Sequence, residues 1–375
     1  MPIFSAHLAL HLLLCSCLAL LAASPARAQK PPEEEKTQAL QLAPEAPDSV
    51  KAETARLAYL SLPVEQRGLL SRQVEESMKN LRRLLGKRKV ARITAWVGGA
   101  GDTRRVSMTI RELLAKWRIP IPAIIVVRVG ALPNPASRVA FDVEVEEADA
   151  VNPHGLMFLA GVRSVSPEFR FDIAAEVGHS LDALERHLAA ESAKPEDALR
   201  VRCFVSLTED MQSLERAVGK RFPNARVRVL QSVRSSPESY ANCDLVARLR
   251  SAPSQPIEAR VLTPREKEAP ITSLTKTNAP TLALTSGQLG FRASDADLAL
   301  AFERLEATLK TAGSSLANAV QLSILADTVD LGRRAEAQGR KYLDARHDPA
   351  ILGVTVEDLP ALDATFSLDA VAVRR

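Results

Sequence analysis

One order of amphipathic helices and apolar strands recurs three times along the chain, and this recurrence constrains the fold more than any other feature. Three predicted helices share an apolar spacing of four, three and four positions: Val74-Met78-Leu81-Leu85, Val177-Leu181-Leu184-Leu188 and Leu298-Phe302-Leu305-Leu309. Residues at this spacing lie on one face of an α-helix, so each helix is expected to pack against a sheet. The sequence therefore predicts three diverged copies of one α/β unit of roughly 100 residues.

The segments that follow each helix also recur in one order: a strand-like run, a second helical stretch and two more strand-like runs. The first runs span residues 90–97, 201–207 and 320–325, and the second helical stretches span 107–117, 211–222 and 333–343. In each closing run an Asp stands between two apolar residues, at Asp142, Asp244 and Asp369, with spacings of 102 and 125 residues. Because insertions between copies fall in loops, these spacings support a repeated unit.

Two further markers allow positions to be compared between copies. The predicted fourth strands open at Ile124, Arg226 and Ile351, which have the same spacings of 102 and 125 residues. Upstream, Ala160-Gly161 corresponds to Ser286-Gly287 at a step of 126 residues. We use these equivalences below to compare candidate sites.

The N-terminal segment predicts an exported protein. Residues 8–23 are almost entirely apolar, and Ala26-Arg27-Ala28 offers a small-x-small cleavage pattern, so residues 1–28 are interpreted as a signal peptide. Residues 29–50 are rich in Pro, Glu and Gln and are predicted to form a flexible linker. The three copies are then assigned to residues 51–148, 149–252 and 253–375. We expect the mature protein to be periplasmic or secreted.

Composition and cysteine content narrow the classes of partner. A formal net charge of +4 is too small to indicate nucleic acid or a membrane as a partner, and an apolar content of 46% supports a well-filled core. After cleavage only Cys203 and Cys243 remain, and two separate buried thiols are the preferred prediction. A disulfide stays open as the alternative if the two strands are neighbours in an oxidising compartment. No Cys/His spacing indicates a metal site, and no cofactor is predicted.

The third copy contains short segments that occur in order at the spacing of a known family. They are Leu282–Gln288 (LALTSGQ), Ala312–Asn318 (AGSSLAN), Pro349-Ala350, Leu359-Pro360 and Leu368–Ala372 (LDAVA). The first copy carries the similar run PAIIVVRVGALP at 122–133. On these residues the chain resembles the RidA (YjgF-type) family of enamine/imine deaminases, most clearly over residues 271–375.

This resemblance implies a fold and an assembly. Family members are α+β proteins with a chorismate-mutase-like mixed sheet and two helices on one face, and they form homotrimers with ligand pockets at the clefts between subunits. Three units in one chain therefore imply a single-chain pseudo-trimer that is monomeric. The uncovered face of each predicted sheet needs a partner, which agrees with this assembly.

The resemblance also implies site residues. In the family, an Arg in a Pro-Ala-Arg strand start binds the substrate carboxylate, and an acidic residue in the last strand helps to activate water. The Arg position holds Ile124, Arg226 and Ile351, and the acid position holds Asp142, Asp244 and Asp369. Because Ile cannot bind a carboxylate, only Arg226 and Asp244 form a candidate catalytic pair. Further candidate ligand-binding residues are Gly161, Ser286, Gly287, Asp142 and Asp369.

Two alternative interpretations of these residues stay open. Arg228 lies two positions after Arg226, which is also typical of a solvated strand face. The aspartates of the closing strands could pair with basic neighbours instead of serving a site.

A basic segment of the first copy suggests another partner class. Seven basic residues and no acidic one occur from position 79 to 92: Lys79, Arg82, Arg83, Lys87, Arg88, Lys89 and Arg92. This composition could bind RNA or another polyanion. A solvated helix C-terminus is the preferred interpretation, because no aromatic residue is interleaved for base stacking.

Three functions follow, in order of preference. The first is an exported RidA-like protein that binds a small carboxylate-bearing imine, enamine or related metabolite, or acts as a scaffold, with largely eroded deaminase sites. The second is a 2-iminobutanoate/2-iminopropanoate-type deaminase with one competent cleft at Arg226 and Asp244. The third is a polyanion- or RNA-binding module that uses the basic face of the first copy.

Overall fold

The computed structural model describes residues 43–99, 101–165, 172–206, 210–236, 238–262, 272–344 and 348–374. The predicted signal peptide and residues 29–42 of the predicted linker lie outside these ranges. The last two linker residues, Ser49 and Val50, differ from the prediction because they begin strand β1 (Ser49–Glu53). Within the described ranges, none of the helices combines the length and apolar character that a membrane crossing requires.

Sheet 1 is a four-stranded mixed sheet covered by two helices. Its elements are β2 (Leu57–Ser61), α2 (Leu70–Leu85), β3 (Lys89–Gly98), α3 (Thr103–Lys116), β4 (Ala123–Val129) and β5 (Val139–Glu146). The strand order is β2-β5-β3-β4, with β3 and β4 parallel and the other pairs antiparallel. Helix α3 begins four residues before its predicted start, because the Asp102 carboxylate caps it by accepting hydrogen bonds from the N–H groups of Arg104 and Arg105.

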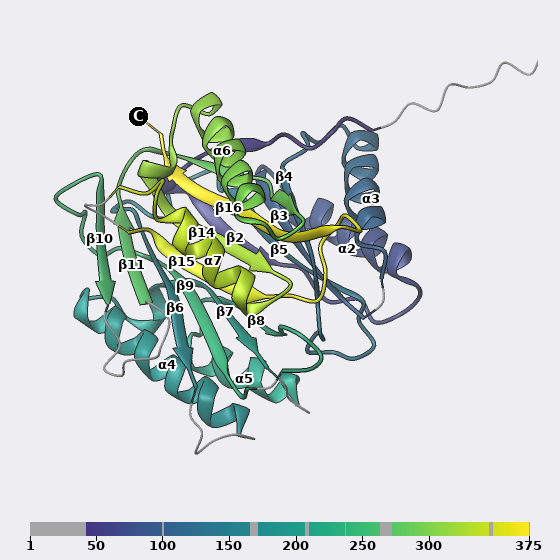
Figure 1. The fold of residues 1–375 in the computed structure, drawn as a ribbon, viewed down its shortest axis with the longest axis horizontal. Helices are drawn as coiled ribbons and strands as arrows, with labels where there is room; N and C mark the ends of the chain where they lie inside the picture. The colour runs from purple at the N-terminus through teal and green to yellow at the C-terminus, as the bar shows by residue number, and fades with distance from the viewer. Residues whose placement is uncertain are drawn as a thin grey trace, which may run out of the picture. The chain divides into compact units, whose positions relative to one another are not determined.

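Sheet 2 repeats this arrangement and adds two strands at one edge. Its elements are β6 (Leu156–Ser164), α4 (Ile173–Ala190), β7 (Ala198–Val205), α5 (Met211–Arg221), β8 (Arg226–Gln231), β9 (Ala241–Arg248), β10 (Ile257–Leu262) and β11 (Thr272–Thr277). In the order β10-β11-β6-β9-β7-β8, the last four strands lie as β2, β5, β3 and β4 do in sheet 1. Helices α4 and α5 cover one face (Figure 1), where their apolar residues share a cluster with the sheet.

Sheet 3 has the same strand order once more. Its elements are β12 (Thr281–Thr285), β13 (Gln288–Phe291), α6 (Asp295–Thr311), β14 (Ala319–Ala326), α7 (Val329–Gly339), β15 (Ala350–Thr355) and β16 (Ala364–Val373). The order is β1-β12-β16-β14-β15, and β13 also pairs with β16. In the described residues the chain therefore has three mixed sheets and six α-helices, which confirms a mixed α+β fold.

Two kinds of apolar core hold the sheets. Between each sheet and its helices lies a helix-side core, which contains for example Phe141 of β5 at sheet 1, Phe222 after α5 at sheet 2 and Phe302 of α6 at sheet 3. The opposite faces of all three sheets contribute to one further cluster, which we call the central core. In the central core Trp96 and Phe204 meet edge to face, with ring centroids 5.5 Å apart, and so join sheets 1 and 2.

Two strands, β1 and β11, do not join the sheet to which the next strand of the chain belongs. β1 precedes β2 but pairs with the outer edge of β12, and β11 precedes β12 but pairs with the outer edge of β6. The predicted boundary at 51 therefore assigns most of β1 to the first copy, although β1 belongs to sheet 3. The boundary at 253 assigns β10 and β11 to the third copy, although they belong to sheet 2. Residues 147–155, which connect β5 to β6, contain no strand. Within the described part of the chain, sheet 1 receives no added strand, so β2 forms its edge.

Candidate functional site

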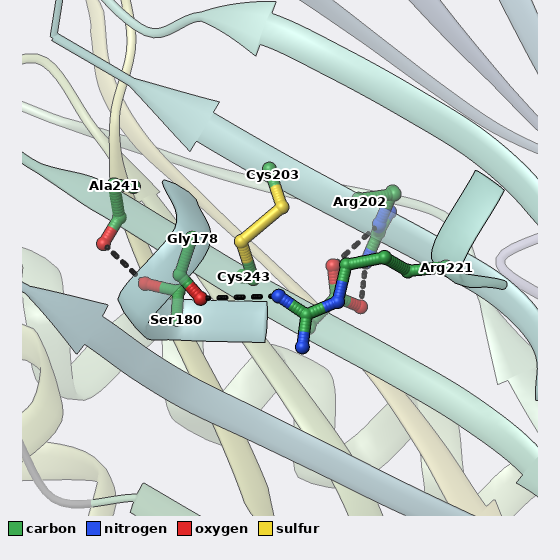
Figure 2. The surroundings of a disulfide bond; sticks show 8 residues. Gly178, Ser180, Arg202, Cys203, Arg221, Ala241 and Cys243 are labelled. Carbon is green, nitrogen blue, oxygen red and sulfur yellow. Dashed lines mark hydrogen bonds and ion pairs between the residues drawn. A yellow bond between two sulfur atoms is a disulfide. The ribbon is translucent and has the colours of Figure 1, made fainter. Parts of the chain in front are cut away.

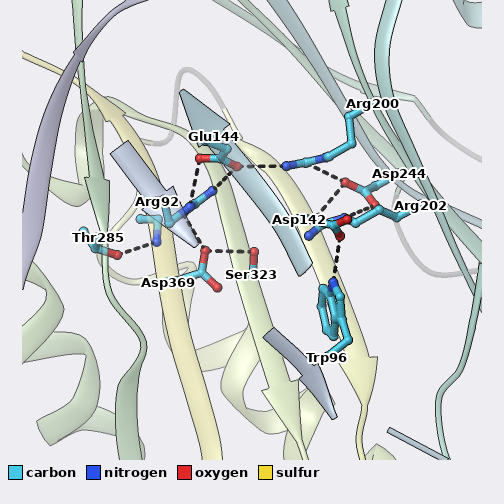
Figure 3. Close-up of polar contacts among 11 residues, drawn as sticks. Arg92, Trp96, Asp142, Glu144, Arg200, Arg202, Asp244, Thr285, Ser323 and Asp369 are labelled. Atoms are coloured by element: carbon cyan, nitrogen blue, oxygen red, sulfur yellow. Dashed lines mark hydrogen bonds and ion pairs between the residues drawn. The ribbon is translucent and has the colours of Figure 1, made fainter. Parts of the chain in front are cut away.

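The three aspartates of the closing strands point into one cluster of buried charges between the sheets. We call it the central ion-pair cluster; its members are Arg92, Asp142, Glu144, Arg200, Arg202, Arg228, Asp244 and Asp369. Four guanidinium groups thus face four carboxylates from all three sheets, as Figure 3 shows for most of them. The charges balance, which is how a protein tolerates so many ionised groups away from water.

Asp244 on β9 is the most tightly held carboxylate of the cluster. Arg202 binds it with two hydrogen bonds of 2.9 Å, and Arg200 Nη2 donates a third, also 2.9 Å. The side chain is 0% exposed. Burial opposes ionisation, but the charges and hydrogen bonds of Arg202 and Arg200 hold the pKa of Asp244 below its ordinary value.

Glu144 on β5 connects the three sheets. Arg92 of β3 donates to both of its oxygens at 2.9 Å, and Arg200 of β7 donates to Oε1 at 3.0 Å. Arg92 also reaches Asp369 on β16 through Nη1 at 3.0 Å. Charge-assisted bonds of this kind are roughly twice as strong as neutral ones, so they fix how the three sheets meet.

Asp369 and Asp142 each accept two hydrogen bonds, one fewer than Asp244. Besides Arg92, Asp369 accepts one hydrogen bond from Ser323 at 3.2 Å, and burial raises its pKa because these contacts do not offset the loss of water. Asp142 accepts from Trp96 Nε1 at 2.7 Å and from Arg228 Nε at 3.3 Å. All three aspartates thus have basic partners, as the structural alternative required.

The alternation of the strands explains why these side chains meet. On β7, Arg200, Arg202 and Phe204 face the centre, while Val201 and Cys203 lie in the helix-side core. Sequence reasoning did not single out Arg200, Arg202 or Glu144. The available signal was a set of charged residues at alternate positions of strands that are otherwise apolar.

Arg226 borders this cluster, lining one cavity with Asp142, Glu144, Arg200 and Arg202, but it is not among the ion-paired members. It is exposed at the start of β8, and its Nε donates to the carbonyl of Tyr59 on β2 at 3.3 Å. The cavity beside it is lined in part by Tyr59, Thr94, Arg200 and Arg202, and offers about 10 Å³ to the centre of a water molecule. A cavity of that size holds about one water.

The structure does not bring Arg226 and Asp244 together. Strand β7 lies between β8 and β9, and the oxygens of Asp244 are bound by Arg200 and Arg202 of that strand. The interpretation of Arg228 as part of a solvated strand face is wrong, because Arg228 is 3% exposed and ion-paired to Asp142.

The predicted equivalence of Arg226 with Ile124 and Ile351 is wrong by one residue. In β3, β7 and β14 the residues that pair with the closing-strand aspartates are known from the register. Arg92, Arg200 and Gln321 each lie two positions before that residue. Their parallel partners are Ala123, Arg226 and Ala350. Ile124 and Ile351 instead lie in the helix-side cores, because one residue of shift moves a side chain to the other face of a strand.

The remaining predicted ligand residues make backbone contacts. The Ser286 hydroxyl donates to Pro47 O at 2.7 Å and accepts from Ile124 N–H at 3.0 Å. Gly287 follows it between β12 and β13. Gly161 is at a bulge of β6 with φ +75°, and its carbonyl accepts from Thr272. These contacts explain Ser286 and Gly161 as parts of the packing between segments.

Cys203 and Cys243 form a disulfide, so the preference for separate thiols is wrong. The two residues lie directly opposite each other on β7 and β9, with Cα atoms 4.1 Å apart. Figure 2 shows the bond close to Ser180 of α4, and both cysteines lie in the helix-side core of sheet 2. The pairing depends on strand register, which residue spacing alone could not supply.

Of the seven basic residues in the segment 79–92, only Arg92 is buried, and the other six are exposed or half-buried. Arg92 is buried in the central ion-pair cluster, Lys79 pairs with Glu76, and Arg88 pairs with Glu147. In the described ranges, no group of three or more His, Cys, Asp or Glu side chains is placed to hold a metal ion.

Comparison with known proteins gives similarity for about a third of the chain. No protein-family model and no curated protein matches the sequence. The solved structure of RidA from the Antarctic bacterium Psychrobacter sp. PAMC 21119 is similar at 23% identity over 24% of this chain and 80% of that chain, with a TM-score of 0.23. YjgF-family structures from Neisseria meningitidis and Mycobacterium tuberculosis each have 19% identity, cover 32% and 31% of this chain and 98% and 99% of theirs, and have the same TM-score. No functional conclusion follows from similarities of this size.

Proposed function

We propose that this chain is an exported, non-catalytic scaffold protein: a single-chain counterpart of a RidA-like homotrimer whose clefts between units are closed. The observation that most directly supports this proposal is the bonding of the Asp244 carboxylate. Its two oxygens accept three charge-assisted hydrogen bonds from Arg200 and Arg202. A single-chain trimer would also explain why one strand order recurs in three sheets that share a central core.

The chemistry of imine hydrolysis supports a non-catalytic role. Water must add to the imine carbon and ammonia must leave, so a general base needs a free lone pair near a water and the substrate. The lowered pKa of Asp244 makes it a weak base, and Arg226 is separated from it by β7. The cavity of about 10 Å³ beside Arg226 has no room for a four-carbon imino acid.

The disulfide supports the export part of the proposal. Structural disulfides persist in oxidising compartments and are rare in the cytosol. Cys203 and Cys243 are both 0% exposed, so their bond is of the structural kind. The predicted signal peptide accounts for how the chain would reach such a compartment.

An ammonia-release assay tests the proposal. We expect the mature protein to release ammonia from freshly generated 2-iminobutanoate or 2-iminopropanoate no faster than buffer, and Arg226→Ala to change nothing. An active RidA deaminase serves as the positive control in the same mixture. Release well above the buffer rate that Arg226→Ala abolishes would instead establish the deaminase alternative.

A further inference from the structure

The outer edge of β2 lacks the strand that covers the matching edge in the other two sheets. Tyr59, Phe158 and Leu284 occupy matching positions, because each pairs with the residue two positions after a closing-strand aspartate. Val50 of β1 lies opposite Leu284, and Thr275 of β11 lies opposite Phe158. Among the described residues, no strand residue lies opposite Tyr59 on its outer side.

The hydrogen-bond pattern shows which backbone groups this edge presents. Leu62 N–H donates to Phe141 O, so every second residue back from it, Leu60 and Ala58, bonds β5. The N–H and C=O groups of Leu57, Tyr59 and Ser61 therefore face outward.

Side chains form hydrogen bonds with only some of these outward-facing backbone groups. Asn152 Nδ2 donates to Leu57 O at 2.7 Å, and Arg226 Nε donates to Tyr59 O at 3.3 Å. In the part of the chain that the structure describes, the outward N–H of Tyr59 and both backbone groups of Ser61 have no protein partner. An unpaired edge of this kind is a template for another strand.

We propose that the β2 edge binds an extended segment of a partner protein as an antiparallel strand, with an acidic side chain of that segment on Arg226. This inference gives the proposed scaffold role a partner and rests on it. β1 and β11 illustrate this way of adding a strand, since each pairs antiparallel with the matching edge of its sheet. Backbone hydrogen bonds would supply affinity, and the side chains along the edge would supply specificity.

The packing around β2 is compatible with an added strand. β8 lies against β2, but β4 lies against β12 and β15 against β6 in the same manner, although β1 and β11 occupy those edges. A backbone N–H of the incoming strand would replace Arg226 as the donor to Tyr59 O. The exposed guanidinium of Arg226 would then be free to bind a carboxylate, which is why the proposed segment is acidic.

The partner is a strand rather than a small molecule for two reasons. The neighbouring cavity of about 10 Å³ has room for about one water. The unpaired groups instead form a row along the strand, which an extended backbone matches in spacing.

Peptide binding to the mature protein tests this inference. The probe is a blocked, fluorescently labelled peptide with the sequence of residues 47–55, which contains Val50 and, two positions before it on the same face, Asp48, and whose strand already pairs with β12. Of the three matching edges in the described residues, β1 and β11 occupy two, so the β2 edge is the matching edge open to it. We expect saturable binding by fluorescence anisotropy, and about tenfold weaker binding when the peptide carries an N-methyl group at Val50 or Lys in place of Asp48.

Two variants of one residue locate the binding. Ser61→Pro removes an outward N–H and spares the hydrogen bonds to β5, as Pro is tolerated on the open side of an edge strand. We expect it to weaken binding about tenfold, the factor for one lost hydrogen bond, while the matched Ser61→Ala retains full binding. If Ser61→Pro lowers the thermal midpoint, Arg226→Ala replaces it, with about tenfold weaker binding expected.

Amide hydrogen exchange of the unaltered protein gives an independent readout. The peptide should slow exchange at Tyr59 and Ser61 and leave the amides of β12 unchanged. Absence of binding, or protection elsewhere, overturns the inference. Protection of these amides without peptide would mean that the chain's own N-terminal segment covers the edge, or a second copy if it depends on concentration, and either result overturns it. The ammonia assay is separate, so failure here leaves the proposed function standing.

Discussion

Asp244→Ala is expected to lower the free energy of unfolding by about 3–5 kcal/mol, because it leaves the buried guanidinium group of Arg202 without a bonded carboxylate and takes one of two carboxylate partners from Arg200. Both side chains are at most 8% exposed, so bulk solvent does not compensate for the lost oxygens. Urea denaturation followed by circular dichroism measures the change. The loss should appear as a lower midpoint at an unchanged slope.

Asp369→Ala is the matched control at the corresponding position of the third sheet. Arg92 keeps both of its hydrogen bonds to Glu144 when Asp369 is removed. The raised pKa of Asp369 also shows that its charge is poorly compensated in the fold. We expect a smaller loss of about 1–2 kcal/mol. Equal losses for the two variants would contradict the assignment of Asp244 as the principal anchor.

The two aspartates should also respond oppositely to acid. The lowered pKa of Asp244 means that its contribution is present above the ordinary Asp pKa of about 3.9 and is lost as pH falls through the lowered value. The raised pKa of Asp369 means that its ionisation costs stability above the raised value, and this cost disappears below about 3.9. The free energy of unfolding of Asp369→Asn should therefore increase relative to that of the wild type as pH rises. That of Asp244→Asn should decrease relative to the wild type over the same change.

Removal of the disulfide in the double variant Cys203→Ala, Cys243→Ala is expected to cost about 4 kcal/mol of unfolding free energy. The bond closes a loop with a sequence separation of 40 residues, and the chain-entropy relation gives about 4 kcal/mol for a loop of that length. The cysteines lie opposite each other in strands that stay paired without the bond, so the fold itself should persist. Urea midpoints of the oxidised wild type and the double variant give the difference.

Chemical reduction of the wild type is the control for this variant. Reduced wild type under denaturing titration should approach the double variant, since both lack the same constraint on the unfolded chain. An unchanged midpoint in both would mean that the unfolded chain is already restricted near these strands, and would contradict the entropic account.

Much of the fold followed from local pattern. The three helical stripes predicted from apolar spacing are buried against their sheets, as Val74, Val177 and Leu298 illustrate. The strand runs and the aspartates of the closing strands were likewise placed correctly in order. These features depend on periodicity, which a single sequence displays directly.

The features that the sequence did not predict depend on pairing between distant strands. The strand register shows that Ala123 and Ala350, and not the predicted Ile124 and Ile351, are equivalent to Arg226. Likewise, Cys203 and Cys243 lie opposite each other because β7 pairs with β9. The ion pairs of Arg92 with Glu144 and Asp369 also need the sheets to be assembled. Residue spacing carries no information on which edge of which sheet a strand joins.

The pairing of β1 with β12 also determines when the fold can be finished. Val50 and Leu284 are partners although 234 residues separate them in the chain. β1, the first strand of the described residues, therefore stays without its partner until most of the protein has been made, and loops of this length slow folding. Sheet 1 contains only strands from residues 57–146 and can form early, whereas sheet 3 needs β1 together with strands from residues 281–373. Assembly should thus end with closure by the N-terminal strand.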